Sequence, residues 1–526
     1  MENKKMKIIS IASIIALALT LVTATYAFFV AQTGEGAQTD IKINANTVDT
    51  FTFEAGSALN LSLNQENFAS GKGNQTGTTF AKAMLTANNK TNTATEHYYL
   101  YLNISNNTFT YSIDNNTPEI LLSIKDGSNN EITSVSGLNY KTVTDGKGAS
   151  IKGFDITKKS GLITILNNRE ITTTSTKTEQ WNVTVTFVNY NANQAGNAGK
   201  RFSAKLMIQQ EKILTVLSDV CTSGNNLATC ITTLSNKSEP SIVNIYHHDS
   251  SLANGARDNS YRYAGANPNN FVCFGTTESP CPTDNLYRII GVINDKVKLI
   301  KYDYMTTDEL GTDGDYSQTY KEWGMDSTYK GTYGDGERIG VYFWNKDAST
   351  NTWSTSLLNK TNLNTNFINY LGTTWANKIA TVTWKVGGNT YANISDVVPA
   401  TTYQNEIVNP VTTNTTDNAT TYSAKIGLMY VSDYGFAASP DAWTLTMSSY
   451  NNTTATNNNW MYMGLYEWTI SRDADRSDRA FDVDFGGNVS NFNVHGNYGV
   501  RASFNLESSV SYVSGSGSMS DPIVIN

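Results

Sequence analysis

The chain has 526 residues, enough for two or three domains, and a formal net charge of −8. Hydrophobic residues make up 39% of the chain, aromatic residues 11% and charged residues only 16%. Abundant aromatics together with few charges favour folded domains over disorder. The negative charge argues against a nucleic-acid partner, because such proteins need a basic face. The four His residues leave little material for metal or general-base chemistry. We therefore expect no cofactor, no metal site and no catalytic residue, and a binding protein rather than an enzyme.

The N-terminal residues indicate export. Three lysines within the first seven residues precede the apolar residues 8–22, and Thr25 and Ala27 have the spacing of a cleavage site. This pattern predicts a secretory signal peptide within residues 1–30. An uncleaved membrane anchor is the alternative, because the apolar stretch continues through Val30 and is long enough to span a bilayer. Either interpretation places the rest of the chain outside the cell or on its surface.

Residues 31–212 predict an all-β domain, a sandwich of jelly-roll kind. Residues 99–104, 181–187 and 202–208 alternate between a more apolar and a more polar face, as half-buried antiparallel strands do. Turn-forming segments such as 126–130, which contains Asp, Gly and Asn, separate these runs. Many short strands with polar turns are typical of a β-sandwich.

The N-terminal half also resembles a known group of surface proteins. The signal segment, the Ala27-Phe28-Phe29 junction and the polar all-β segment that follows are similar to camelysin/TasA-like proteins of Gram-positive surfaces. The resemblance implies that the early mature segment can serve as a donated strand. It therefore implies self-assembly through the N-terminal sandwich.

Residues 213–285 are expected to form a disulfide-containing connector. Cys221 and Cys230 are nine residues apart, and Cys273 and Cys281 are eight apart. In an exported chain an even number of Cys in two short loops predicts two local disulfides, Cys221–Cys230 and Cys273–Cys281. Zinc binding is the alternative, but the close Cys-x-x-Cys spacing of structural zinc sites is absent.

Residues 286–526 predict an α+β domain. An Asn294-Asp295 turn lies between two apolar runs, which is the signature of a β-hairpin. Later segments place apolar residues at three-and-four spacing, as in short helices. The predicted elements, in chain order, are the hairpin over 286–301, helices over 353–358 and 363–371, and a buried strand over 426–431.

Five segments of this domain, taken together, resemble a known family. They are residues 286–300, 353–367 and 427–429, Gly464-Leu-Tyr-Glu-Trp-Thr469, and the closing Gly499-Val-Arg-Ala-Ser-Phe-Asn-Leu506. Together they resemble bacterial C-type-lectin-like domains of the formylglycine-generating-enzyme/sulfatase-modifying type, although Ala502 replaces the usual Pro. Formylglycine-generating activity needs cysteines in the C-terminal part of that fold, and no Cys follows Cys281. Some members are retroelement-diversified variable proteins, in which a loop-rich stretch near the end displays ligand-binding residues.

The corresponding stretch here, residues 471–501, is the candidate binding segment. Valines such as Val494 recur between polar and aromatic residues, which we expect to face solvent as in antibody-type binding surfaces. The alternative is an ordinary solvated loop in an Asn-rich protein. A loose match to a calcium loop over 473–484 lacks the required Gly and Glu. Glu467 is expected to satisfy a buried backbone group or Arg501 rather than to act as a catalytic acid. The candidate ligand-binding residues are Asp482, Asp484, Phe485, Asn488, Ser490, Asn491, Phe492, His495, Asn497 and Tyr498.

The sequence thus indicates a secreted or cell-surface bacterial binding protein, adhesin-like in character. The expected partner is a protein or glycan on another cell or host surface, with no nucleic acid, and with the membrane only through an uncleaved N-terminal segment. The alternative is a structural fibre or biofilm matrix subunit without a specific ligand.

Overall fold

The computed structural model of the protein describes residues 49–526 apart from 69–70, 89–91, 321–328, 334–337, 411–419 and 452. The chain is rich in β-sheet and divides into two compact units, one ending at Ile213 and the other beginning at Leu214. The predicted signal peptide or anchor lies outside the described residues. Within the described part of the chain, no helix is long and apolar enough to cross a membrane.

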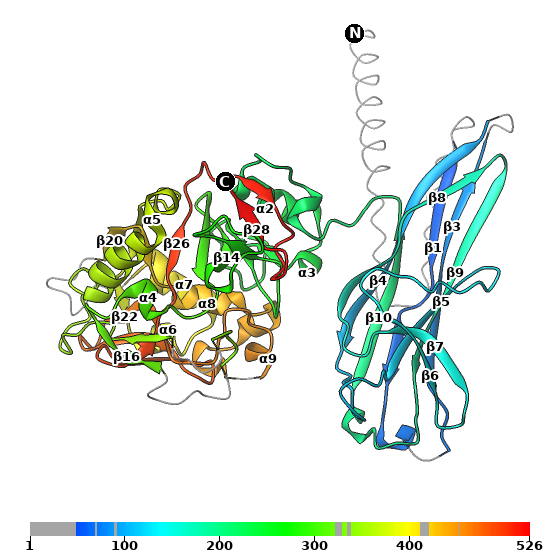
Figure 1. The fold of residues 1–526 in the computed structure, drawn as a ribbon, viewed down its shortest axis with the longest axis horizontal. Coiled ribbons are helices and arrows are strands. Elements are labelled where there is room, and N and C mark those ends of the chain that lie inside the picture. The colour runs from blue at the N-terminus through cyan, green and yellow to red at the C-terminus, as the bar shows by residue number, and fades with distance from the viewer. Residues whose placement is uncertain are drawn as a thin grey trace, which may run out of the picture. The chain divides into compact units, whose positions relative to one another are not determined.

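The described residues of the N-terminal unit form two antiparallel sheets (Figure 1). The expected strands over 99–104, 181–187 and 202–208 are present, and the Asp126 turn closes with a backbone hydrogen bond from Asn129. One sheet has the order β1 (Thr50–Ala55), β3 (Gln75–Thr86), β9 (Thr176–Phe187), β5 (Ile120–Asp126), β7 (Ser150–Asp155) and β6 (Tyr140–Thr144). The other has the order β2 (Leu59–Ser62), β10 (Arg201–Gln209), β4 (Ala94–Asn107) and β8 (Gly161–Thr173).

The two sheets share one apolar core and one buried polar link. Inward-facing residues of β3 and β9 pack with those of β4 and β10 in a single cluster. The hydroxyl of Tyr98 in β4 accepts a hydrogen bond from Trp181 Nε1 at 2.8 Å and donates one to Glu179 at 2.7 Å, and both partners lie in β9. Burial opposes ionisation of Glu179, but the hydrogen bonds from Arg169, Tyr98 and Lys177 outweigh it and lower the pKa of that carboxyl.

The C-terminal unit contains two larger sheets and a short strand pair. One sheet has the order β21 (Ile426–Gly427), β26 (Ser503–Asn505), β15 (Lys296–Lys301), β14 (Leu286–Ile293), β13 (Phe271–Cys273), β28 (Ile523–Ile525) and β27 (Tyr512–Ser514), with β12 (Tyr261–Tyr263) pairing β14 and β11 (Ile245–His247) pairing β12. The second has the order β16 (Tyr316–Thr319), β17 (Gly340–Tyr342), β25 (Tyr498–Gly499), β22 (Glu467–Asp473), β23 (Arg479–Val483) and β24 (Val489–Asn493), with β19 (Gly388–Asn389) pairing β22. The short pair is β18 (Val382–Lys385) with β20 (Thr421–Ala424).

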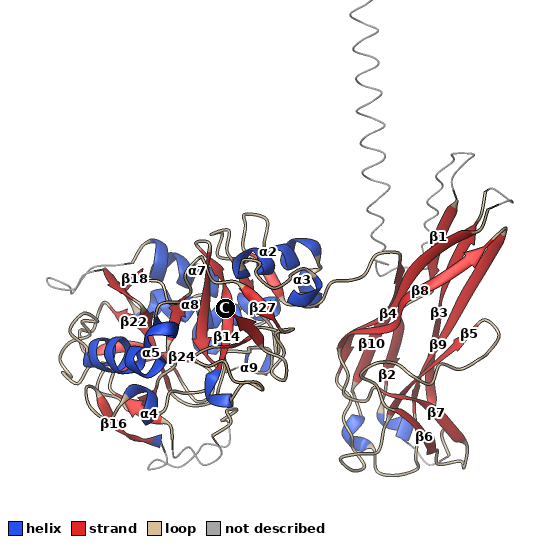
Figure 2. Ribbon diagram, turned by 45° about the horizontal axis from the view of Figure 1, so that its top comes forward, coloured by secondary structure: helices blue, strands red, loops and turns tan. Residues whose placement is uncertain are grey.

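Helical segments lie around these sheets (Figure 2). The longer ones are α2 (Leu227–Lys237), η6 (Leu358–Phe367) and α5 (Ile368–Ala376). The shorter ones are α3 (Pro240–Val243), α4 (Thr307–Leu310), α6 (Tyr391–Ile394), α7 (Pro399–Tyr403), η7 (Gln404–Val408), α8 (Val431–Ala437) and α9 (Thr453–Thr456). Single-turn segments of this unit are η3 (Leu217–Asp219), η4 (Thr283–Asn285), η8 (Pro440–Thr444) and η9 (Met447–Ser449), whereas η1 (Gln65–Phe68) and η2 (Ala195–Asn197) belong to the N-terminal unit.

The segment expected as a connector, 213–285, belongs to the C-terminal unit from Leu214 onward. Leu227 and Ile231 of α2 and Val272 of β13 are buried in the main core of that unit. The structure contains both predicted disulfides, Cys221–Cys230 and Cys273–Cys281.

Backbone hydrogen bonds also join the beginning of the C-terminal unit to its end. Gly224 N–H donates to the carbonyl of Tyr512 at 2.9 Å, and Tyr512 N–H donates to that of Asn225 at 2.8 Å. Leu227 N–H donates to the carbonyl of Val510 at 3.2 Å. Residues 224–227 therefore lie against residues 510–512 as a paired segment.

The predicted hairpin over 286–301 is confirmed, whereas two other predicted elements differ. Asn294 and Asp295 have φ values of 50° and 59°, as a tight two-residue hairpin turn requires. Residues 353–355 form a turn instead of a helix, and the helical segment begins only at Leu357. The expected strand over 426–431 is limited to Ile426–Gly427, because Val431 begins helix α8.

Candidate functional site

The predicted binding segment forms adjacent strands of one sheet. β23 pairs with β22 on one side and with β24 on the other, and Asp482 lies opposite Ser490 in the β23–β24 ladder. The turn between β23 and β24 is built by Asp484, whose Oδ1 accepts backbone hydrogen bonds from Gly486 at 2.8 Å and Asn488 at 2.9 Å. Gly487 has φ +97°, a conformation that disfavours other residues, so the sequence fixes the shape of this turn.

Four aromatic side chains follow one another across this surface, and we call them the aromatic row: Phe485, Tyr466, Tyr498 and Phe492. Phe485 meets Tyr466 edge-on at 5.5 Å between ring centroids, and Tyr466 stacks on Tyr498 at 4.8 Å. Phe492 lies 5.6 Å from Tyr498. Phe485 and Phe492, at the two ends of the row, are 42% and 49% exposed. The rings of Phe485 and Phe492 are therefore held in contact with solvent by the two tyrosine rings between them.

Two predicted binding residues are buried, contrary to the expectation that the whole set faces solvent. Tyr498 is 7% exposed because it packs against Trp468 at 4.4 Å as well as against the aromatic row. Asp482 is 1% exposed, and its Oδ1 has no hydrogen-bond partner among the described residues. Burial raises the pKa of Asp482 well above its ordinary value, and the charge of Asp484 adds to the effect.

The remaining predicted residues differ in solvent exposure and in the contacts that their side chains make. His495 is exposed, with its ring stacked on Phe343 at 3.8 Å. Asn491 donates to the carboxylate of Asp473 and accepts a hydrogen bond from Arg479 at 3.0 Å, so its amide serves the framework. Asp484, Asn488, Ser490 and Asn497 are half-buried. Val494, expected to be a framework residue, is fully buried.

Of the two partners expected for Glu467, a buried backbone group or Arg501, the structure shows Arg501. Arg501 donates from Nε to Oε1 at 2.8 Å and from Nη2 to Oε2 at 2.9 Å, and both side chains are buried. Burial raises the pKa of Glu467, while the Arg501 charge and its hydrogen bonds oppose that rise. The pair is a framework contact between β22 and the segment leading into β26.

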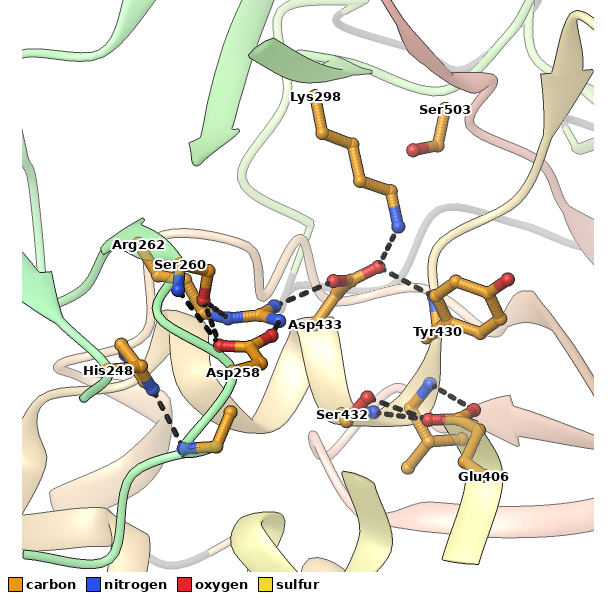
Figure 3. Close-up of polar contacts among 12 residues, drawn as sticks. His248, Asp258, Ser260, Arg262, Lys298, Glu406, Tyr430, Ser432, Asp433 and Ser503 are labelled. Atoms are coloured by element: carbon orange, nitrogen blue, oxygen red, sulfur yellow. Dashed lines mark hydrogen bonds and ion pairs between the residues drawn. The ribbon is translucent and has the colours of Figure 1, made fainter. Parts of the chain in front are cut away.

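A second polar cluster, which sequence reasoning missed, lies at the N-terminus of α8 (Figure 3). Arg262 from β12 donates to Asp258 at 2.8 Å and to Asp433 at 3.2 Å, and Lys298 from β15 donates to Asp433 at 2.5 Å. Arg262, Lys298 and Asp433 are almost completely buried. Two cations face two carboxylates, so the cluster is neutral as a whole and fastens α8 to the hairpin.

Carboxylates also satisfy the free backbone N–H groups at the start of α8. Asp433 accepts from Tyr430 N–H at 3.0 Å, and Glu406 accepts from the backbone N–H groups of Val431 and Ser432. Burial raises the pKa of Glu406, whereas hydrogen bonds from Ser471, Ser432 and the backbone oppose the rise. These contacts explain why Val431 begins a helix.

A cavity of about 420 Å³ lies beside this cluster, with Trp384, Tyr403 and Tyr430 among its walls. The Lys298 ammonium lies 4.4 Å from the Tyr430 ring centroid and 5.3 Å from that of Trp384. Because Asp433 already neutralises Lys298, the cavity does not need an anion. No group of three or more metal-ligating side chains occurs among the residues that the structure describes.

The sequence held little signal for this cluster. Arg262 and Asp433 are separated by 171 positions, and Lys298 and Asp433 by 135. The local signs were a lysine inside the apolar strand 296–301 and an acid three residues after Tyr430. Neither observation indicates which distant residue forms the ion pair.

Comparison of the sequence with protein-family models finds no match, and comparison with curated proteins finds no relative.

Proposed function

We propose that the chain is a secreted or cell-surface bacterial binding protein that recognises a protein or glycan through the aromatic row and the β23–β24 turn. In this proposal the N-terminal unit is a jelly-roll-like sandwich and the C-terminal unit is a C-type-lectin-like head. The observation that carries the proposal is the exposure of Phe485 and Phe492 at the two ends of a packed aromatic row.

Rigidity supports this proposal. Trp468 packs against Tyr498 of the row at 4.4 Å, and the Tyr462 hydroxyl fixes the backbone of Phe485 with a hydrogen bond to its carbonyl at 2.6 Å. A ligand that covers Phe485 and Phe492 gains apolar burial, while the protein loses little conformational freedom. Preorganised aromatic anchors of this kind dominate many binding surfaces.

The polar surroundings suit a ligand rich in hydroxyl or amide donors. Asp484 precedes Phe485 in the chain, and its Oδ2, which accepts one hydrogen bond from the Asn488 amide, has a second lone pair that can accept such a donor. Aromatic faces beside acceptors fit the alternating apolar and hydroxyl faces of a sugar, and they also fit a peptide backbone with an apolar side chain.

The test compares the full chain with Phe492→Ala and Phe485→Ala on glycan and protein arrays, followed by titration of each ligand found. We expect each substitution to weaken binding by at least tenfold, because a buried aromatic anchor contributes about 1–2 kcal/mol or more. The matched control is Tyr370→Ala, since Tyr370 is 46% exposed on α5. Unchanged binding by both folded Phe variants would rule out this surface.

A structural fibre or matrix subunit is the second candidate, and one strand favours it. β8 is 13 residues long, and among the described strands it pairs with β4 alone. A long open edge can accept a strand from another copy. Fibre formation that persists in the Phe variants and is abolished by a proline in β8 would support this candidate.

A further inference from the structure

A second, smaller cavity lies apart from the charge cluster at α8. It has a volume of about 150 Å³, and its walls include Arg288, Tyr302, Lys330, Trp460 and Tyr462. Two of these side chains are cations, and no carboxylate is among the described residues that line the cavity.

Arg288 is a buried cation, and no carboxylate of the described residues forms an ion pair with it. The residue lies in β14, is 4% exposed, and sits between the rings of Phe271 at 4.2 Å and Trp460 at 4.7 Å. Its guanidinium donates to Asn270 Oδ1 at 2.7 Å and to the carbonyls of Pro268 and Trp460 at 3.1 and 3.5 Å. All three acceptors are neutral, so these contacts leave the positive charge uncompensated.

Four other buried cations of the same unit have a carboxylate within 3.2 Å: Arg262, Lys298, Lys301 and Arg501. Arg472 is buried as well, and its Nε donates to the neutral carbonyl of Val386, but Arg472 does not line this cavity. Burial lowers the pKa of Arg288 to about 9, and the nearby positive charge of Arg501 contributes in the same direction. A buried charge without a counter-charge is costly unless another group supplies one.

The cavity offers donors as well as charge. A guanidinium has five N–H groups, and three are used by the contacts of Arg288, which leaves one on each terminal nitrogen. Two guanidinium N–H groups can bind the two oxygens of an oxyanion. Lys330 adds a second cation, since its ammonium lies 4.2 Å from the Tyr462 ring centroid and donates to the carbonyl of Thr456 at 3.2 Å.

We propose that this cavity binds the oxyanion group of an acidic ligand, a carboxylate or a sulfate, with Arg288 and Lys330 as its counter-charges. The proposal stands on the cavity itself and does not require the aromatic row to bind anything. The two sites nevertheless share Tyr462, which lines the cavity and holds the carbonyl of Phe485. An acidic ligand on the aromatic row would have this cavity beside it.

The experiment measures thermal unfolding and calorimetric titration of the full chain with D-glucuronate, acetate and sulfate at constant ionic strength. D-glucose and chloride are the controls for the sugar ring and for general salt effects. We expect glucuronate or one of the other oxyanions to raise the unfolding temperature, because a ligand that binds only the folded state stabilises it. Glucose and chloride should have no such effect. The oxyanion that stabilises most identifies the class of acidic group.

Variants separate binding from packing. Lys330→Gln should weaken the oxyanion affinity by about tenfold, which corresponds to the loss of one charge-assisted hydrogen bond. Lys360→Gln, an exposed lysine of η6, is the matched control. Arg288→Lys should abolish the effect if the variant folds, and Lys330→Gln decides the question if it does not.

Phe492→Ala should leave oxyanion binding intact, so failure of this site and failure of the aromatic row are distinguishable. Equal stabilisation by chloride, or an unchanged affinity in Lys330→Gln, would overturn the proposal. In that case Arg288 serves only to tie Pro268, Asn270 and Trp460 together.

Discussion

Arg501 and Glu467 form a bidentate ion pair in which neither side chain reaches solvent. The pair joins β22, which carries part of the aromatic row's support, to the segment that leads into β26. Because both charged groups are buried, removing one partner costs more stability than it would at a surface salt bridge.

Glu467→Gln should therefore lower the free energy of unfolding by about 3–5 kcal/mol, since it leaves the Arg501 charge buried without its counter-charge. Chemical denaturation monitored by tryptophan fluorescence measures this, because Trp181 is the single Trp before residue 214. Glu278→Gln, on an exposed loop, should change stability by less than about 0.5 kcal/mol. Equal effects of the two substitutions would contradict the role assigned to the pair.

Acid should destabilise the C-terminal unit through His248. This side chain is fully buried against Phe436 and Trp443, and its Nδ1 accepts the Ala256 N–H at 3.0 Å. Burial lowers the pKa of His248 to about 3, whereas the pKa of an unfolded His is about 6.5. Between these values the unfolded chain binds more protons, so stability is lost as pH falls, by about 1.4 kcal/mol per pH unit below 6.5.

His248→Asn keeps an acceptor for the Ala256 N–H and cannot take up a proton. Denaturation curves between pH 4 and pH 7 should therefore show a shallower loss of stability in this variant than in the wild type. His97→Asn, at a half-buried position of β4 in the N-terminal unit, should leave the acid dependence of the C-terminal unit unchanged. Parallel pH profiles of the wild type and His248→Asn would rule out His248 as the source.

Asp482→Asn should stabilise the protein at neutral pH. Burial raises the pKa of Asp482, so between the unfolded value and the raised folded value the folded chain binds the proton more tightly, and stability falls as pH rises. The amide substitution removes this penalty and should gain about 1–3 kcal/mol at pH 7. The gain should shrink as pH is lowered toward 4, and exposed Asp441→Asn should show none.

Tyr498 and Phe492 should separate stability from binding. Tyr498→Ala removes a buried ring from between Tyr466 and Trp468 and should cost about 3–5 kcal/mol of folding stability. Phe492→Ala should cost about 1 kcal/mol or less, since nearly half of that ring is already in solvent. Val494→Asp should unfold the unit, because it buries an unpaired charge. Thermal unfolding measures all three, and comparable losses for Tyr498→Ala and Phe492→Ala would contradict their placement.

Elements fixed by neighbouring residues were predictable from the sequence. The hairpin over 286–301 needs only two apolar runs and an Asn-Asp pair that tolerates positive φ, and both disulfides close loops of eight or nine residues. The strands of the N-terminal unit follow from period-two alternation, because the core lies on one face of each sheet.

Features that depend on distant partners were not predictable. Val431 begins a helix because Glu406, 25 residues away, accepts its N–H, and a run of apolar residues alone favours a strand there. Tyr498 resembles a surface residue in sequence, but the parallel pairing of β22 with β25 brings Trp468 and Tyr466 against it. The sequence pattern identified the buried valines of the candidate site. The division of its other residues into exposed and buried ones depends on tertiary contacts.

The pairing of residues 224–227 with residues 510–512 has a mechanical consequence. In a chain held at its N-terminal side and pulled through a bound ligand, tension enters the C-terminal unit at Leu214 and reaches this paired segment early. The Cys221–Cys230 disulfide ties the entry segment covalently to α2, so the pull is shared between a covalent loop and the hydrogen bonds to Tyr512 and Val510. Residues 510–512, near the end of the chain, thus brace the segment that follows the point where tension would enter the C-terminal unit.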